Sequence, residues 1–202
     1  ILKMIRDELG ADYDIEKHFT PSYKPWDQRI CLVPDSDLFR SIKDKKSSVV
    51  TDTIDEFLSD GILLNSGEKI EADIIVTATG IELNSLNGID VAIDNVEVIP
   101  NERLTYKGMM LSGVPNFAMS FGYVNASWTL RADLTCEYVC RLINLMDKKG
   151  MSCCEPIDDK EAHGEDRLID FTSGYFQRGL SQMPKQGNKA PWKNYQNYLK
   201  DI

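Results

Sequence analysis

A succession of short apolar runs separated by turn signals, between residues 48 and 80, constrains the fold of this 202-residue chain more than any other feature. The runs are rich in Ile, Leu, Val and Thr. The tripeptides Ser-Asp-Gly and Asn-Ser-Gly between them supply the residues that tight turns require. The predicted strands cover residues 48–54, 54–58, 61–64 and 70–77. This pattern predicts a β-meander.

The run at residues 73–80 reads Asp-Ile-Ile-Val-Thr-Ala-Thr-Gly. Its continuous apolar stretch is typical of a strand buried on both faces, as in a parallel sheet. Ala78, Thr79 and Gly80 at its end are small, and Gly80 permits a backbone conformation that other residues avoid. The chain could therefore pass close to a bound ligand here. A plain strand end with a glycine turn is the alternative.

Helical periodicity recurs along the rest of the chain. Residues 1–10 predict an amphipathic helix ending at Gly10, and residues 35–42 predict a second, short helix. The longest predicted helix covers residues 126–148. Its expected apolar side consists of Leu130, Leu134, Val139, Leu142, Ile143, Leu145 and Met146. Further strands are predicted at 96–99 and 116–122, and further helices at 174–182 and from about residue 194. Together these elements predict an α/β fold.

Composition narrows the classes of partner. The net charge is −9, and the longest basic cluster, residues 43–46, is interrupted by Asp44. Neither nucleic acid nor an anionic membrane surface is therefore an expected partner. No apolar run approaches 18 residues, so no membrane span is predicted. The chain begins without Met, which suggests a piece of a longer polypeptide.

The five cysteines form no Cys-x-x-Cys motif, and the two histidines lie far apart in the sequence. This spacing does not match a zinc site, so no metal site is predicted. Reduced cysteines in a cytoplasmic protein explain the odd number best.

One arginine, Arg29, stands in a loop that prolines and aromatic residues stiffen. Pro21 and Pro25 restrict the backbone on either side of Tyr23, and Trp26 adds rigid surface. A guanidinium held in such a loop suits the binding or stabilisation of an anion. The alternative is structural: Arg29 stacks on Trp26 or pairs with Asp27.

The segment 117–134 predicts a strand, a turn and the start of the long helix. Free backbone N–H groups and the helix dipole at such a start favour a negatively charged group. A phosphate and the pyrimidine edge of a reduced flavin are both candidates. Most helix starts with Asn or Ser, however, serve only the helix. The chain contains no Gly-x-Gly-x-x-Gly and no Gly-x-Ser-x-Gly motif.

Four ordered segments together carry a family resemblance. They are KHFTPSYKPWDQRICLVPDSDLFRSI, VVTDTIDEFLSDGILLNSGEKIEADIIVTATG, YKGMMLSGVPNFAMSFGYVNASWTLRADL and PKQGNKAPWKNYQNYLKDI. Through them the chain resembles the C-terminal half of class B flavoprotein monooxygenases of the Baeyer–Villiger type.

The resemblance implies two Rossmann-like dinucleotide-binding domains. Residues 1–79 would then be the C-terminal part of the NADPH-binding domain, and residues 80–202 the C-terminal part of the FAD-binding domain with a tail. The family's two glycine fingerprints and its Phe-x-Gly-x-x-x-His signature are absent from this chain. The chain is therefore expected to be a fragment, inactive alone, that lacks the pyrophosphate cradles for FAD and NADPH.

In such enzymes NADPH reduces FAD, O₂ adds to the flavin, and the C4a-peroxyflavin oxygenates a ketone or oxidises a sulfide or amine. By resemblance, Arg29 is the catalytic arginine, and it also contacts the cofactors together with Trp26. Further cofactor contacts are implied for Ala78, Thr79, Gly80, Asn125, Ala126, Ser127, Trp128 and Trp192. Trp192 would lie on a loop closing over the cofactors, or in a packing strap. Tyr123 and Met110 would face the substrate.

Two other functions remain open from the sequence. The chain could belong to a flavin-containing N- or S-monooxygenase, although Arg29 favours the ketone reaction. It could also be an interaction or dimerisation module that works without cofactor. Sheet edges left unpaired could join copies of the chain, so a homo-oligomer is also an expectation.

Overall fold

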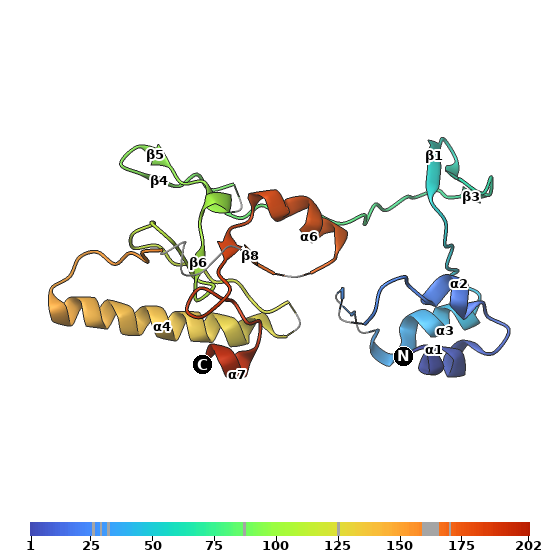
Figure 1. The fold of residues 1–202 in the computed structure, drawn as a ribbon. Helices are drawn as coiled ribbons and strands as arrows, with labels where there is room; N and C mark the ends of the chain where they lie inside the picture. Colours follow the sequence, from blue (N-terminus) through green and yellow to red (C-terminus); the bar gives the residue numbers. More distant parts are fainter. Residues whose placement is uncertain are drawn as a thin grey trace. The chain divides into compact units, whose positions relative to one another are not determined.

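The computed structural model describes residues 1–202 apart from Trp26, Arg29, Leu32, Asn87, Asn125, residues 159–165 and Asp170 (Figure 1). The chain forms two compact units. One comprises Ile1–Pro25 and Ile30–Thr79, and the other comprises Trp26–Arg29 and Gly80–Ile202. The assignment of these parts to NADPH-binding and FAD-binding domains stays a prediction.

The first unit opens with a group of short helices. They are α1 (Leu2–Leu9), α2 (Ile15–Phe19), the 3₁₀ turn η1 (Pro34–Ser36) and α3 (Asp37–Lys43). Helix α1 ends where Gly10 adopts φ 89° and its N–H bonds to the Arg6 carbonyl. An ion pair of 2.8 Å between Lys43 and Glu8 joins α3 to α1. The two helices predicted for this region are therefore confirmed.

A small antiparallel sheet completes the first unit. Its strands β1 (Ile54–Leu58), β2 (Gly61–Leu64) and β3 (Lys69–Glu71) pair in sequence order. Gly61 is required because a Cβ at this position would lie 2.0 Å from the carbonyl oxygen of Ile70 on β3. The sheet contains the predicted strands 54–58 and 61–64, but β3 stops at Glu71 and residues 48–53 form no strand.

The predicted buried strand at residues 73–80 is wrong for this chain. The segment has no strand structure, and Ile74 and Val76 each expose 83% of their surface. A strand of this kind needs hydrogen-bonded neighbours and covering layers. Among the described residues none pairs with it. The described part of the chain is thus α/β with small antiparallel sheets, and a Rossmann-type parallel sheet is not confirmed.

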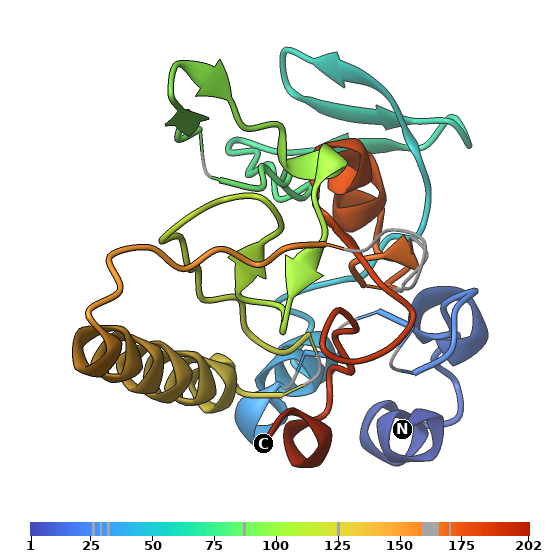
Figure 2. The same ribbon diagram turned by 60° about the vertical axis from the view of Figure 1, so that its left-hand side comes forward.

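The described residues of the second unit form three two-stranded antiparallel sheets (Figures 1 and 2). They pair β4 (Ala92–Ile93) with β5 (Val96–Glu97), β6 (Thr105–Tyr106) with β7 (Met110–Leu111), and β8 (Asp166–Arg167) with β9 (Lys185–Gln186). Its helices are α4 (Trp128–Lys149), α6 (Gly174–Gly179) and α7 (Tyr198–Asp201), with 3₁₀ turns η2 (Pro100–Glu102) and η3 (Leu180–Gln182).

Two sequence predictions for this unit need correction. Residues 116–122 form no ladder, although the Met119 N–H donates to the Met109 carbonyl at 2.7 Å. The last helix begins at Tyr198 rather than near Asn194, because Asn194 is buried and its side chain serves tertiary contacts. The strand predicted at 96–99 is confirmed for Val96–Glu97, which form β5, and the helix predicted at 174–182 is confirmed in α6 and η3.

Helix α4 has the predicted length but buries an unexpected face. Its fully buried residues are Arg131 and Thr135, whereas Ile143 and Leu145 of the predicted apolar side are 51% and 47% exposed. The helix ends at Gly150, which takes the left-handed conformation that glycine permits. Asn194 and Asp201 of the C-terminal tail accept hydrogen bonds from Arg131. These contacts explain why the side of α4 that carries Arg131 is the buried one. None of the helices that the structure describes is both long and apolar enough to cross a bilayer.

Two apolar clusters form the core of the second unit. The first contains Leu168, Ile169, Phe171, Phe176 and Met183, and the second contains Val98, Leu111 and Val114. Leu83, Phe121 and Val124 pack against the first cluster. This cluster therefore joins the segment after Gly80, the segment before α4, and helix α6.

Candidate functional site

The candidate site lies at the start of helix α4. Ser127 is the N-cap residue, but among the described residues its hydroxyl bonds to the Thr129 hydroxyl, at 2.7 Å, and accepts from no backbone N–H of the first turn. The backbone N–H groups of that turn can therefore meet a ligand. Trp128 packs on Phe121, with ring centroids 5.5 Å apart. A Cβ at Gly122 would come within 2.3 Å of the Trp128 ring, so only glycine fits there.

The turn before α4 is attached to the C-terminal tail. The Tyr123 hydroxyl donates to Asp201 Oδ2 at 2.9 Å, and the Val124 N–H donates to Gln196 Oε1 at 2.9 Å. Tyr123 is only 1% exposed. Burial, followed by the hydrogen bond to Asp201, raises the pKa of Tyr123 to about 12. Tyr123 therefore stays protonated and acts as a donor.

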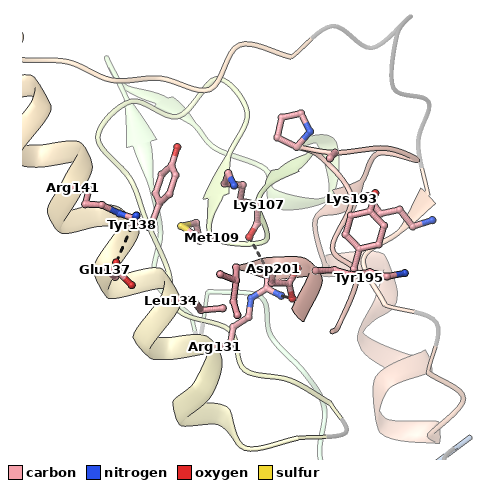
Figure 3. Close-up of a pocket in the computed structure, with 14 residues that line it drawn as sticks. Lys107, Met109, Arg131, Leu134, Glu137, Tyr138, Arg141, Lys193, Tyr195 and Asp201 are labelled. Carbon is pink, nitrogen blue, oxygen red and sulfur yellow. Dashed lines mark hydrogen bonds and ion pairs between the residues drawn. The ribbon is translucent and has the colours of Figure 1, made fainter. Parts of the chain in front are cut away.

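Arg131 lies at the centre of this attachment (Figure 3). Its side chain is 3% exposed, and its Nη1 atom lies 2.6 Å from Asp201 Oδ2 and 2.9 Å from Asn194 Oδ1. Its Nη2 atom donates to the Lys107 carbonyl at 2.8 Å. A Cβ at Gly108 would lie 2.4 Å from Nη2, so the β6–β7 turn leaves space for the guanidinium by carrying a glycine. The buried charge is thus paired and hydrogen bonded.

A cavity of about 190 Å³ adjoins Arg131, between α4, the β6–β7 turn and the tail (Figure 3). Five basic and two acidic side chains line it: Lys107, Arg131, Arg141, Lys193, Lys200, Glu137 and Asp201. Burial, followed by a hydrogen bond to Tyr106, raises the pKa of Tyr138 in its wall to about 12. The cavity is smaller than the roughly 300–1,000 Å³ of usual ligand pockets.

Gly80 opens the second unit and has φ 103°, a conformation suited to glycine. The residues that follow it pack on α6: Arg178 Nη2 donates to the Ile81 carbonyl at 3.1 Å, and Gly179 lies against Leu83. Leu83 and Val124 contact the same apolar cluster. The structure thus brings the segment after Gly80 together with the turn before α4. Ala78 and Thr79 are exposed and belong to the first unit.

Three of the predicted site residues, Trp26, Arg29 and Asn125, lie outside the described residues. Their neighbour Asp27 is described: its carbonyl accepts hydrogen bonds from the N–H and the hydroxyl of Thr172, at 3.3 and 2.8 Å. Thr172 follows Phe171 of the first apolar cluster. The roles of Arg29, Trp26 and Asn125 stay predictions.

Trp192 is 3% exposed and packs edge-on against Tyr106, with ring centroids 5.3 Å apart. This placement corresponds to the packing alternative, and its contact with a cofactor stays a prediction. Met110 is also buried.

Arg131, Asp201, Asn194 and Gln196 were not predicted as site residues from the sequence. The available signal was a cation placed between Leu130 and Leu134, within the predicted apolar stripe, where it would require a buried partner.

From end to end, the chain is similar to part of the FAD-containing monooxygenases. It is 51% identical over 204 residues to the FAD-containing monooxygenase EthA of Mycobacterium tuberculosis (strain ATCC 25618 / H37Rv). It is 48% identical over 202 residues to the probable FAD-binding monooxygenase AlmA of Acinetobacter baylyi, and 44% identical to the putative FAD-containing monooxygenase MymA of Mycobacterium tuberculosis.

Each of these matches covers 100% of this chain but only 40% or 41% of the relative. The chain therefore spans about two fifths of the length of the relatives it matches. The resemblance to flavoprotein monooxygenases is confirmed. No protein-family model matches the chain, and no solved structure matches it significantly.

Proposed function

We propose that this chain is part of an FAD-dependent monooxygenase that takes electrons from NADPH and inserts one oxygen atom of O₂ into a small-molecule ketone. The observation that carries the proposal is the similarity of the whole chain, at 44–51% identity, to proteins named as FAD-containing or FAD-binding monooxygenases. Oxidation of a sulfide or an amine by the same machinery is the second candidate, since these relatives' names do not specify the atom that is oxidised.

The residues at the start of α4 would suit the isoalloxazine end of a flavin. The first turn of α4 offers N–H groups that Ser127 does not cap, and the missing side chain of Gly122 lets Trp128 pack close to the backbone. These features suit the electron-rich pyrimidine edge of an isoalloxazine. The pyrophosphate end has no counterpart, because the chain has no Gly-x-Gly-x-x-Gly motif. A flavin site would therefore need residues beyond these 202.

When bound, FAD would supply the electron transfer to O₂. The residues of this chain would supply orientation and charge. Ala126, Ser127 and Trp128 would hold the ring against the start of α4, and the helix dipole would stabilise negative charge on it. Arg29 would stabilise an anionic oxygen near the ring, because a guanidinium keeps its charge at any working pH. Ketone oxygenation needs this anion more than sulfide oxidation does.

Flavin content and turnover of the longer protein that carries this chain test the proposal. We expect a yellow protein that oxidises NADPH in the presence of O₂ and converts a ketone into an ester, as mass spectrometry would show. A product formed from sulfides or amines but not from ketones would favour the second candidate. A colourless protein without NADPH oxidation would favour an interaction module.

The role of Arg29 can be tested separately in that protein. We expect Arg29→Ala to lower ketone oxygenation by about 100-fold, the usual effect of losing one donor to a developing oxyanion. FAD content should be unchanged. Arg6→Ala is the matched control, since Arg6 is a half-exposed arginine that pairs with Glu16 on the surface. Ketone oxygenation at the parent rate in Arg29→Ala would rule out the assignment.

We also propose a cytoplasmic location for the protein. All five cysteines are unpaired in the structure, as a reducing compartment would leave them.

A further inference from the structure

A buried polar cluster joins the C-terminal tail to the start of α4. We call it the Arg131 clamp; its members are Tyr123, Arg131, Asn194, Gln196 and Asp201. Asp201 accepts from both Tyr123 and Arg131, and Asn194 Oδ1 accepts from Arg131 and, at 3.3 Å, from the Gln196 N–H. Arg131 also lies over the Tyr123 ring, with its Cζ atom 5.3 Å from the centroid. The cluster therefore links two segments about 70 residues apart in sequence.

The clamp holds the chain on both sides of the residues proposed to meet the flavin. Tyr123 and Val124 are bound to the tail just before Ala126, and Arg131 is bound to it one turn after Trp128. In Figure 3 the guanidinium of Arg131 points from α4 to Asp201 and to the Lys107 carbonyl. The backbone from Ala126 to Trp128 is thus anchored at both ends by residues that do not belong to it.

Gln196 has two energetically unfavourable features, which indicate that the surrounding structure holds it in place. Its φ is 51°, in the left-handed region that non-glycine residues seldom adopt. Its Nε2 atom is buried and has no hydrogen-bond partner among the described residues. Both costs fall on the residue that accepts from the Val124 N–H. Such costs persist where the surrounding structure requires one conformation.

We propose that Arg131, Asp201 and Gln196 are positioning residues of the monooxygenase: through Tyr123 and Val124 they hold the backbone from Ala126 to Trp128 where it meets the flavin ring. This inference rests on the proposed function. A buried ion pair is weak evidence for stability, because its desolvation offsets its attraction. A directed, hydrogen-bonded pair does set orientation.

Loss of the clamp should appear as uncoupling. If the ring is poorly held, NADPH, O₂ and a proton yield NADP⁺ and hydrogen peroxide, and no oxygen atom reaches the ketone. Gln196→Ala removes only the acceptor for the Val124 N–H and leaves the Arg131–Asp201 ion pair intact. Asp201→Asn removes the ion pair but keeps a side chain of the same shape.

The experiment uses the full-length protein saturated with FAD. We expect both variants to release a severalfold larger share of NADPH electrons as peroxide, with a shifted flavin absorbance spectrum. Small displacements at a reacting centre cost up to about 100-fold in rate, so ketone kcat should fall while KM for NADPH stays close to that of the parent. Glu137→Ala is the control, because Glu137 pairs on the surface of the same helix with Arg141.

The outcomes separate the two proposals. A parent protein without flavin or NADPH oxidation would overturn the proposed function and the positioning role with it. An active parent, with Gln196→Ala and Asp201→Asn folded, flavin-loaded and as well coupled as the parent, would overturn the positioning role alone. If Asp201→Asn fails to fold, the coupling of Gln196→Ala decides.

Discussion

At the scale of the residue, a polar side chain can be buried in this structure when hydrogen-bond or ion-pair partners are available to it. Arg131 is a cation in the interior of the second unit, and it is accommodated because Asp201, Asn194 and the Lys107 carbonyl all lie within 2.9 Å of it. Tyr123 shares Asp201 and so is held as a donor. Removing one member would leave another buried and unpaired, at a cost of about 3–5 kcal/mol for a charge.

Tyr123 therefore gives a pH-dependent prediction. Its pKa is raised from 10.0 to about 12, so the folded state favours the protonated hydroxyl. Its contribution to the free energy of unfolding is complete below pH 10 and is lost as the pH rises through 12. The ultraviolet absorbance of tyrosinate should show one more late-titrating tyrosine in the parent than in Tyr123→Phe. Tyr138 also titrates late but is present in both proteins. A difference between the two titrations that is centred near pH 10, the pKa of a free tyrosine, would contradict the prediction.

At the scale of the element, the small sheet β1–β3 depends on one close approach between strands. Residue Gly61 begins β2 opposite Glu71, and its missing side chain lets the Ile70 carbonyl come near. The turns on either side of β2 are formed by residues adjacent in the sequence, so their positions could be predicted from the sequence. The contact of Gly61 with β3 depends on how the strands are aligned.

Gly61→Ala should destabilise this sheet. The added methyl group would overlap the Ile70 carbonyl oxygen, so we expect the free energy of unfolding of the first unit to fall by more than about 1 kcal/mol. Urea unfolding and amide exchange in β2 measure the effect. Glu56→Ala on β1 is the control, since this side chain is exposed. Equal stability of the two variants would show that β3 does not approach β2 as described.

At the scale of the whole molecule, the chain forms two compact units, and the exposed segment 73–79 of the first unit lies directly before Gly80 of the second. This segment exposes apolar side chains and is unpaired among the described residues. Such a segment is open to proteases and is also able to pair with another strand.

Limited proteolysis of the 202-residue chain tests this organisation. We expect thermolysin, which cuts before Ile and Val, to cleave first between residues 73 and 77, because Ile74 and Val76 are exposed. Protection that grows with protein concentration would support the self-association predicted from the sequence, with this segment as one of the contacts. Protection at every concentration would contradict the exposed segment.

The sequence determined those elements whose signals are local. Helix α1 ends at Gly10, helix α4 ends at Gly150, and the turns around β2 carry glycine, because the backbone conformations there depend on one or two residues. The similarity to monooxygenases was likewise readable from four segments of sequence. Tertiary structure alone decided that residues 73–80 form no strand and that α4 buries Arg131 in place of Ile143. A buried strand needs neighbouring strands to pair with, and a buried cation needs hydrogen-bond acceptors, and both can come from residues far away in the sequence. The residues next to the strand or the cation therefore do not show whether these partners are present.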